Sequence, residues 1–179
     1  MHLTCAAAVA ACDAIAQATG YRPQIKWIND LVGGQKKLAG ILTELSVDNA
    51  TGNVRYAVVG IGINCCQRRF PPELQDIACS LAMVTGEAPS RSRLAAALIR
   101  ALHHMSQTLI QDKPAIMDRY RRDCVTLGRE VLLIRADRQR EAVALSLDDD
   151  GALTVRLPDG RLETVTSGEA SVRGLWGYL

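Results

Sequence analysis

The chain has 179 residues, with 21 Lys and Arg against 19 Asp and Glu, so its formal charge is 21 − 19 = +2. This length suits one domain, or one domain with a small appendage. Apolar residues make up 48% of the chain and charged residues 22%, which excludes wholesale disorder. The small net charge argues against a dedicated nucleic-acid-binding protein. No apolar stretch approaches the roughly 18 residues of a membrane span.

The N-terminal segment is predicted to be a helix and not a secretory signal. It has no basic start, and Asp13 interrupts its apolar run. Its small residues recur at helical spacing, which indicates a buried, alanine-rich helix over about residues 3–19 that Gly20 ends. Without a secretory signal, CxxC pairs or Cys/His ligand spacing, the six cysteines are expected to be free thiols in a reducing cytoplasm.

The segments that follow alternate between apolar strands and turn-forming residues. A tight connection is expected at Gly33 and Gly34, and the run VRYAVVGIGIN is expected to be a central strand covered on both faces. The predicted elements are a short strand at 24–28, a turn at 29–37, a paired strand at 38–45, a turn at 47–53 and the central strand at 54–64.

Helices are expected next, followed by a second group of strands. Short helices are predicted at 72–86 and 115–124. From residue 130 onward, short strands alternate with turn signals, which is typical of a small β-barrel, and the domain boundary is placed near Val125. The helix predicted at 92–110 carries one apolar face, formed by Leu94, Leu98, Leu102, Met105 and Leu109.

Two glycines inside the predicted central strand need a physical reason, because glycine weakens a strand. Gly60 and Gly62 would point to one face and leave it bare, either for a flat ligand or for close packing of a helix. This segment alone favours neither. It is not a GxGxxG fingerprint, since Cys65 stands at the third glycine position. Asn64 ends the strand with a donor and an acceptor that suit a base edge or a ribose.

Lys26 lies in the short strand at 24–28, where alternation puts it opposite to Ile25 and Trp27. A lysine in that position points to solvent or reaches into a pocket, and solvent is the commoner outcome. Asn29 and Asp30, just beyond, form a turn pair that can cap and brace a loop.

Three segments, in this order and spacing, resemble the motifs of the biotin–protein ligase family: KWINDL at 26–31, KKLAGILTEL at 36–45 and VVGIGIN at 58–64. Ile28 stands where proline is common in the family. The segment SGEASVRG at 167–174 is similar to the close of the small C-terminal β-barrel of such ligases. The resemblance implies an α+β fold like that of class II aminoacyl-tRNA synthetases and biotin ligases. A mixed sheet packed by helices would form a partial catalytic domain over 1–124, and a small β-barrel would follow over 125–179.

The resemblance also implies a two-step acyl transfer. Biotin and ATP would first give biotinyl-5′-AMP, and a lysine of a biotin carboxyl carrier protein, as in acetyl-CoA carboxylase, would then accept the biotin. Mg²⁺ is expected with ATP, although no ligand cluster in the sequence identifies a metal site.

Roles for individual residues follow from the same resemblance. Lys26 would be the catalytic cation that touches both the biotin carboxylate and the α-phosphate of ATP, which overrides the general expectation of solvent. Asn64 would contact the adenosine part, and Asn29 and Asp30 would brace the loop. The biotin pocket would be lined by Lys26, Leu31, Gly40, Gly60, Ile61 and Gly62.

The family's arginine- and glycine-rich GRGRxGRxW loop and its serine/threonine biotin motif do not occur in these 179 residues. We therefore expect the C-terminal part of a ligase, with an unpaired sheet edge and little or no activity by itself. One alternative is a catalytically inactive fragment with a binding or regulatory role. Another is a lipoate-type ligase, which the VVGIGIN and SGEASVRG segments disfavour.

The remaining expectations concern partners and the C-terminal end. We expect no DNA binding and no membrane association by this chain, and we consider a homodimer through sheet edges possible. The basic cluster at 119–123 is interpreted as a solvated helix face, and His103 and His104 as ordinary histidines. Trp176 and Tyr178 are expected to pack against the barrel.

Overall fold

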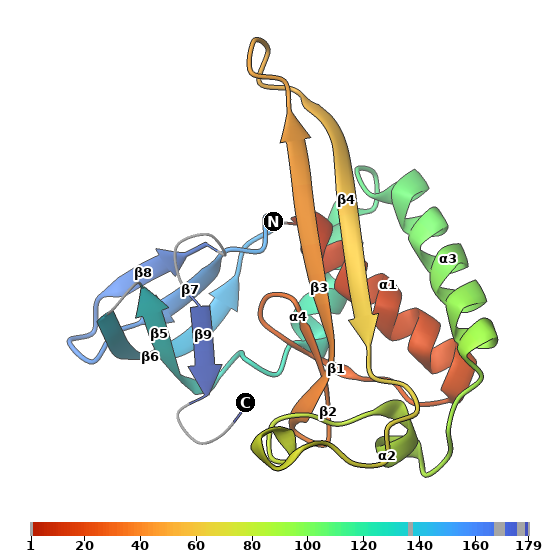
Figure 1. Cartoon of the computed structure of the whole chain (residues 1–179). Coiled ribbons are helices and arrows are strands. Elements are labelled where there is room, and N and C mark those ends of the chain that lie inside the picture. Colours follow the sequence, from red (N-terminus) through yellow and green to blue (C-terminus); the bar gives the residue numbers. More distant parts are fainter. Residues whose placement is uncertain (1, 136–137, 167–170, 175–177, 179) are drawn as a thin grey trace.

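The chain folds into two antiparallel sheets and a group of helices, which confirms the α+β class (Figure 1). The computed structural model describes residues 2–135, 138–166, 171–174 and 178. Helices lie behind and to the right of the first sheet, and the second sheet lies to its left (Figure 1). In the described part of the chain, no helix has both the length and the apolar character needed to cross a membrane.

The first sheet is an antiparallel meander of four strands in chain order. A mixed sheet is the expectation, but parallel pairing among the described residues occurs only as isolated bridges, at Ile25–Cys124 and Lys37–Ala78. The strands are β1 (Gln24–Lys26), β2 (Asp30–Gly33), β3 (Lys36–Val47) and β4 (Val54–Ile63).

Strand β2 corrects the prediction of a turn over 29–37. The chain reverses between Gly33 and Lys36, which are paired, so only two residues form the turn. Gly34 and Gln35 have φ angles of 54° and 66°, as a tight two-residue hairpin requires. Because so short a turn suffices, the residues before it are free to form a strand.

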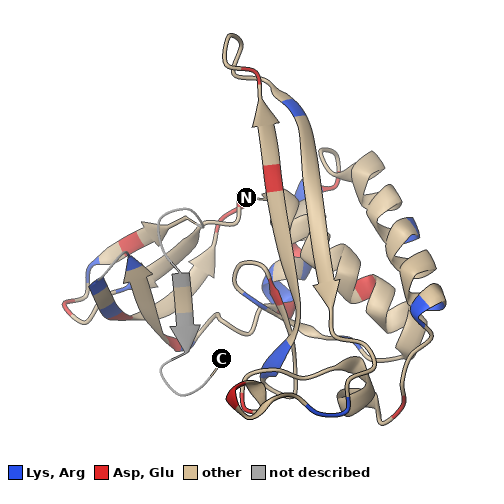
Figure 2. Cartoon of the chain, viewed as in Figure 1, with Lys and Arg blue, Asp and Glu red and all other residues tan. Residues whose placement is uncertain are grey.

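Strand β4 is an edge strand, which makes the prediction of a doubly covered central strand wrong. It pairs only with β3 among the described strands. Its apolar side chains Tyr56 and Val58 are 62% and 51% exposed, whereas Val59, Ile61 and Ile63 pack against the core. Charged residues are sparse along the β3–β4 hairpin, which extends beyond the rest of the molecule (Figure 2). The apolar residues of β4 therefore lie on two faces of the strand, one packed against the core and one exposed.

Helix α1 (His2–Thr19) forms the centre of the core, as the alanine-rich pattern predicts. It packs on the first sheet, where the Thr4 hydroxyl donates to the Thr43 hydroxyl at 3.0 Å. Its small side chains let α3 (Arg91–Thr108) and α4 (Lys113–Asp123) pack closely against it. The amphipathic prediction for α3 is confirmed, because its apolar face lies toward the core.

The helix predicted at 72–86 is replaced by two shorter elements, the 3-10 helix η1 (Pro72–Leu74) and helix α2 (Leu81–Thr85). Ser80 explains the interruption, since its hydroxyl accepts a hydrogen bond from the Met83 amide at 3.2 Å and thereby starts α2.

The second sheet contains the strands expected beyond residue 130. Their order is β8-β7-β6-β5-β9, with antiparallel pairing throughout. The barrel stays a prediction. The strands are β5 (Glu130–Arg135), β6 (Arg138–Leu147), β7 (Leu153–Arg156), β8 (Leu162–Val165) and β9 (Ser171–Gly174).

Candidate functional site

Four residues named by the sequence motifs lie in one row across the first sheet. Lys26 is paired with Asp30, Asp30 with Gly40, and Gly40 with Gly62, so each strand contributes one residue. Directly paired residues point to the same face of a sheet. At about 4.8 Å between neighbouring strands, this site row is roughly 14 Å long. The sheet therefore presents a cation at one end and bare backbone at the other.

The two glycines of β4 face open space. A Cβ atom at Gly62 would meet no described atom within 4 Å, and one at Gly60 would meet only the Leu42 carbonyl oxygen at 3.9 Å. No described helix packs on them, so close helix packing does not explain these glycines. At Gly40 a Cβ atom would lie 3.3 Å from Lys37 Cε, which places this glycine against a lysine side chain.

Lys26 does not point to solvent, although that is the usual outcome for a lysine in a short strand. Its side chain is buried, and its Nζ donates to the backbone carbonyl of Tyr178 at 2.6 Å. The same ammonium lies 3.8 Å from the centroid of the Tyr178 ring, a cation–π geometry. The expectation that Tyr178 packs on the barrel is therefore wrong. Trp176 lies outside the described residues.

Asp30 connects Tyr178 to the site row. It accepts a hydrogen bond from the Tyr178 hydroxyl and forms an ion pair with Lys37 at 2.6 Å. Burial, together with the hydrogen bond to Asp30, raises the pKa of the Tyr178 phenol, so the phenol keeps its proton and acts as a donor. Asp30 thus holds a neutral tyrosine and a cation at once.

Asn29 and Asn64 both use their side-chain amides on the backbone. The Asn29 amide donates to the Ile41 carbonyl at 2.9 Å, and the Asn29 carbonyl accepts from the Ile41 amide at the same distance. This is the geometry expected of a residue that braces the loop after β1. The Asn64 amide donates to the Cys79 carbonyl at 3.0 Å, which ties the end of β4 to the segment before α2.

Leu31 and Ile61 lie on the opposite side of the sheet from the site row. Leu31 is paired with Ala39 and is fully buried, and Ile61 is paired with Ile41 and packs against the core. Only their backbone could take part in a pocket on the open face.

Sequence reasoning missed two residues that hold the loop next to Lys26. The buried Tyr120 hydroxyl donates to the Ile28 carbonyl at 3.0 Å, and the Trp27 amide donates to the Thr126 hydroxyl at 2.9 Å. The peptide bond between Trp27 and Ile28 is cis. No local pattern marks Tyr120 or Thr126, because each acts on a segment more than 90 residues away in the chain.

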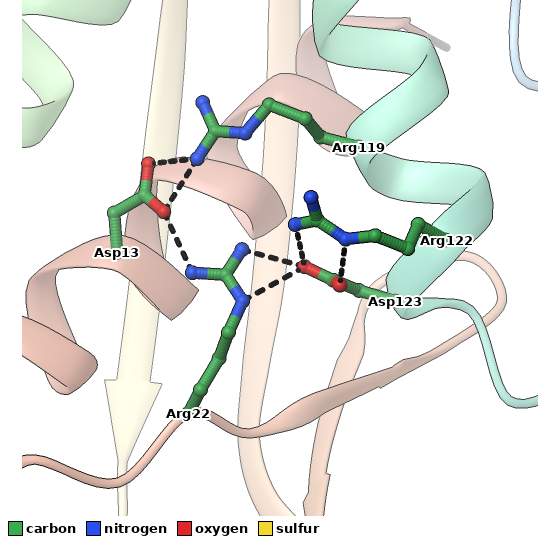
Figure 3. A network of polar contacts seen from close by, with 5 residues as sticks. All are labelled: Asp13, Arg22, Arg119, Arg122 and Asp123. Atoms are coloured by element: carbon green, nitrogen blue, oxygen red, sulfur yellow. Dashed lines mark hydrogen bonds and ion pairs between the residues drawn. The ribbon is translucent and has the colours of Figure 1, made fainter.

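A separate charge network lies between α1, the loop before β1, and α4 (Figure 3). The Arg22 guanidinium donates to Asp13 at 2.8 Å and to Asp123 at 3.0 Å. Arg119 also pairs with Asp13, and Arg122 pairs with Asp123 at 2.9 Å. Part of the predicted solvated basic cluster is thus engaged in structural ion pairs.

No metal centre is formed by the part of the chain that the structure describes, where no three His, Cys, Asp or Glu side chains gather suitably. The acidic side chain in the site row, Asp30, is already paired with Lys37. The site row therefore offers no ligand set for Mg²⁺.

Comparison with protein families gives two matches along the chain. Residues 1–64 match the biotin/lipoate A/B protein ligase family, and residues 126–173 match the biotin protein ligase C terminal domain. The biotin–[acetyl-CoA-carboxylase] ligase of Mycobacterium tuberculosis is 30% identical over 171 residues, which are 93% of this chain and 60% of that protein. The bifunctional ligase/repressor BirA of Escherichia coli is 32% identical over 151 residues, which are 84% of this chain and 46% of that protein.

Solved structures give the same result. The apo biotin protein ligase of Aquifex aeolicus is 25% identical with a TM-score of 0.82, and the match covers 97% of this chain and 75% of that one. The same enzyme in complex with biotin and ATP is 26% identical with a TM-score of 0.78, covering 97% and 72%. This chain spans between 28% and 60% of the length of the curated relatives. With both family matches and this fold, the chain belongs to the biotin–protein ligase family.

Proposed function

We propose that the chain carries the biotin- and ATP-binding part of a ligase that forms biotinyl-5′-AMP and transfers biotin to a lysine of a biotin carboxyl carrier protein. The observation that carries this proposal is the site row, with Lys26 at one end and Gly62 at the other. A small ring system can lie against bare glycine backbone while a carboxylate on a flexible chain reaches the cation. In a related ligase of known structure, biotin and ATP are bound together.

The reaction needs a cation at the point where two anions meet. A biotin carboxylate oxygen attacks the α-phosphorus of ATP, and the bond to pyrophosphate breaks. The carrier lysine amine then attacks the anhydride carbonyl, loses a proton, and releases AMP as the amide forms. Lys26 would offset the repulsion between carboxylate and phosphate and stabilise the charge that develops on phosphorus.

Other groups of the proposed site have supporting roles. Asn64 would contact the adenosine part, and Leu31 and Ile61 would contribute backbone to the biotin pocket beside Gly40 and Gly60. Mg²⁺ would arrive with ATP, and no step is assigned to it here. The 179 residues contain no GRGRxGRxW loop to close over the adenylate. We expect them to have little activity without that loop, since one wall cannot exclude water.

Further proposals concern the setting of the reaction. We propose units at 1–124 and 125–179, a carrier of the acetyl-CoA carboxylase type, no DNA contact by this chain, and a possible homodimer through a sheet edge such as β4. All six thiols are free, which suits a reducing cytoplasm. The match to a biotin protein ligase C-terminal domain favours biotin over lipoate as substrate.

Calorimetric titration with biotin and ATP, combined with biotin-dependent pyrophosphate exchange, tests the proposal. The 179-residue chain is compared with a version extended upstream by the family loop. We expect binding and exchange in the extended protein, and Lys26→Ala should lower exchange about 100-fold or more. Lys113→Ala is the control, because Lys113 is paired with Asp150 away from the site row. Exchange that survives Lys26→Ala would overturn the role of Lys26, and robust turnover by the short chain would overturn the need for the loop.

A further inference from the structure

Tyr178 occupies the position where an anionic ligand would meet Lys26. The Tyr178 carbonyl accepts from Lys26 Nζ at 2.6 Å, and the Tyr178 ring lies 3.8 Å from that atom. One residue thus contacts the ammonium through both its backbone and its side chain. Lys26 is only 7% exposed in this arrangement. A carboxylate could not reach the ammonium without a change at this contact.

Tyr178 is held there by a second contact. The Tyr178 hydroxyl donates to Asp30, and Asp30 is kept in place by its ion pair with Lys37 at 2.6 Å. Asp30 is the direct strand neighbour of Lys26. The two contacts of Tyr178 therefore fall on adjacent residues of the site row, and the phenol–carboxylate bond is the one that a single substitution can remove.

We propose that Tyr178 is a displaceable cover of Lys26, which a carboxylate or phosphate ligand must move aside before it binds. This inference rests on the proposed function of Lys26. A carboxylate or phosphate adds Coulomb attraction to the ammonium, which the neutral Tyr178 carbonyl lacks, and this attraction is larger at a buried group than in bulk water. An anion can therefore replace the Tyr178 carbonyl, whereas a neutral molecule gains too little. The cover therefore favours anionic ligands. It also lowers their apparent affinity, because only the fraction of molecules in which Tyr178 has left Lys26 can bind them.

Amine acetylation followed by mass spectrometry tests the cover without any ligand. In the 179-residue chain, Lys26 should react more slowly than Lys113. Tyr178→Phe removes the hydrogen bond to Asp30 and should raise the rate at Lys26 about tenfold, while Tyr178→Ala removes the ring as well. The rate at Lys113 should not change. Tyr56→Phe is the matched control, because Tyr56 is 62% exposed on β4. Fast labelling of Lys26 in the unsubstituted chain, or rates unmoved by both substitutions, would overturn the proposal.

Biotin affinity tests displacement in the upstream-extended protein. Tyr178→Phe should tighten biotin binding by at least about threefold, because more molecules are open. Weaker or unchanged binding would mean that Tyr178 is a permanent wall of the site, which contradicts a displaceable cover. If no version binds biotin, the proposed function fails, and the acetylation rates alone decide whether Tyr178 covers Lys26.

Discussion

At the scale of single residues, substitution of Gly62 should have opposite effects on ligand affinity and on folding stability. A methyl group added there would meet no described atom within 4 Å, and alanine is favoured over glycine inside a strand by about 0.5–1 kcal/mol. We expect Gly62→Ala to fold with slightly raised stability in urea denaturation. In the upstream-extended protein, it should lower biotin affinity at least about tenfold, because the methyl group holds the ring system away from the backbone.

The two readouts for Gly62→Ala must diverge for this interpretation to hold. A variant that binds biotin as the parent does would show that no ligand lies against β4 at this point. A variant that loses stability would show that Gly62 has a packing role.

How far the candidate site could be predicted differs from residue to residue. The motif residues from Lys26 to Gly62 could be found because they are close in the chain and share a recognisable pattern. Tyr178 could not, since its contact with Lys26 joins residues 152 positions apart and no local signal marks it. Leu31 is assigned to the pocket by resemblance alone, and its side chain is buried in the core, which no local pattern in the sequence indicates.

At the scale of elements, the charge network fixes α4 against the segment that leads into β1 (Figure 3). Burial alone would raise the pKa of Asp123, but hydrogen bonds from Arg122 and Arg22 lower it. Asp123→Asn should cost about 1–2 kcal/mol of unfolding free energy at pH 7, between the values typical of exposed and of buried pairs. Urea denaturation over a range of pH measures this.

The pH dependence of Asp123→Asn has a definite sign. A carboxyl whose pKa is lowered in the folded state adds stability above its unfolded pKa of about 3.9 and loses it as the pH falls. The difference between the two proteins should therefore shrink below about pH 4. Asp118→Asn serves as the control, because the exposed Asp118–Arg121 pair should contribute less than about 1 kcal/mol. Equal effects of both substitutions would contradict a special role for the network.

Helices with a regular spacing of apolar or small residues can be predicted from the sequence. Elements whose ends depend on one turn or one hydrogen bond cannot. The helices α1 and α3 follow from small or apolar residues at helical spacing. Strand β2 was missed because two glycines near it suggested a longer turn than the two residues that form it. The helix predicted at 72–86 is too long. The hydrogen bond at Ser80 that starts α2 is a single contact, and the spacing of apolar residues does not reveal it.

At the scale of the whole molecule, the open face and free edge of β4 favour self-association of the 179-residue chain. Val58 and Leu42 are 51% and 62% exposed on this surface, and an edge strand also offers unpaired backbone groups. We expect concentration-dependent association in sedimentation velocity. Val58→Lys should reduce it, since a lysine on an edge strand opposes pairing with a second chain.

The matched control for Val58→Lys is Ile99→Lys, because Ile99 is 68% exposed on α3 rather than on the sheet. It introduces the same charge and should leave association unchanged. A chain that is monomeric at all concentrations, or an equal effect of both substitutions, would contradict association through β4.

The meander that builds the site row also has a kinetic consequence. The row assembles from successive hairpins within 26–62, so its formation requires only short loop closures. The contact of Tyr178 with Lys26 closes a loop of 152 positions, which makes it the slower event. We therefore expect refolding molecules to pass through a stage in which the row exists and Lys26 is still open. During that interval, a chain emerging from synthesis could already capture an anionic ligand.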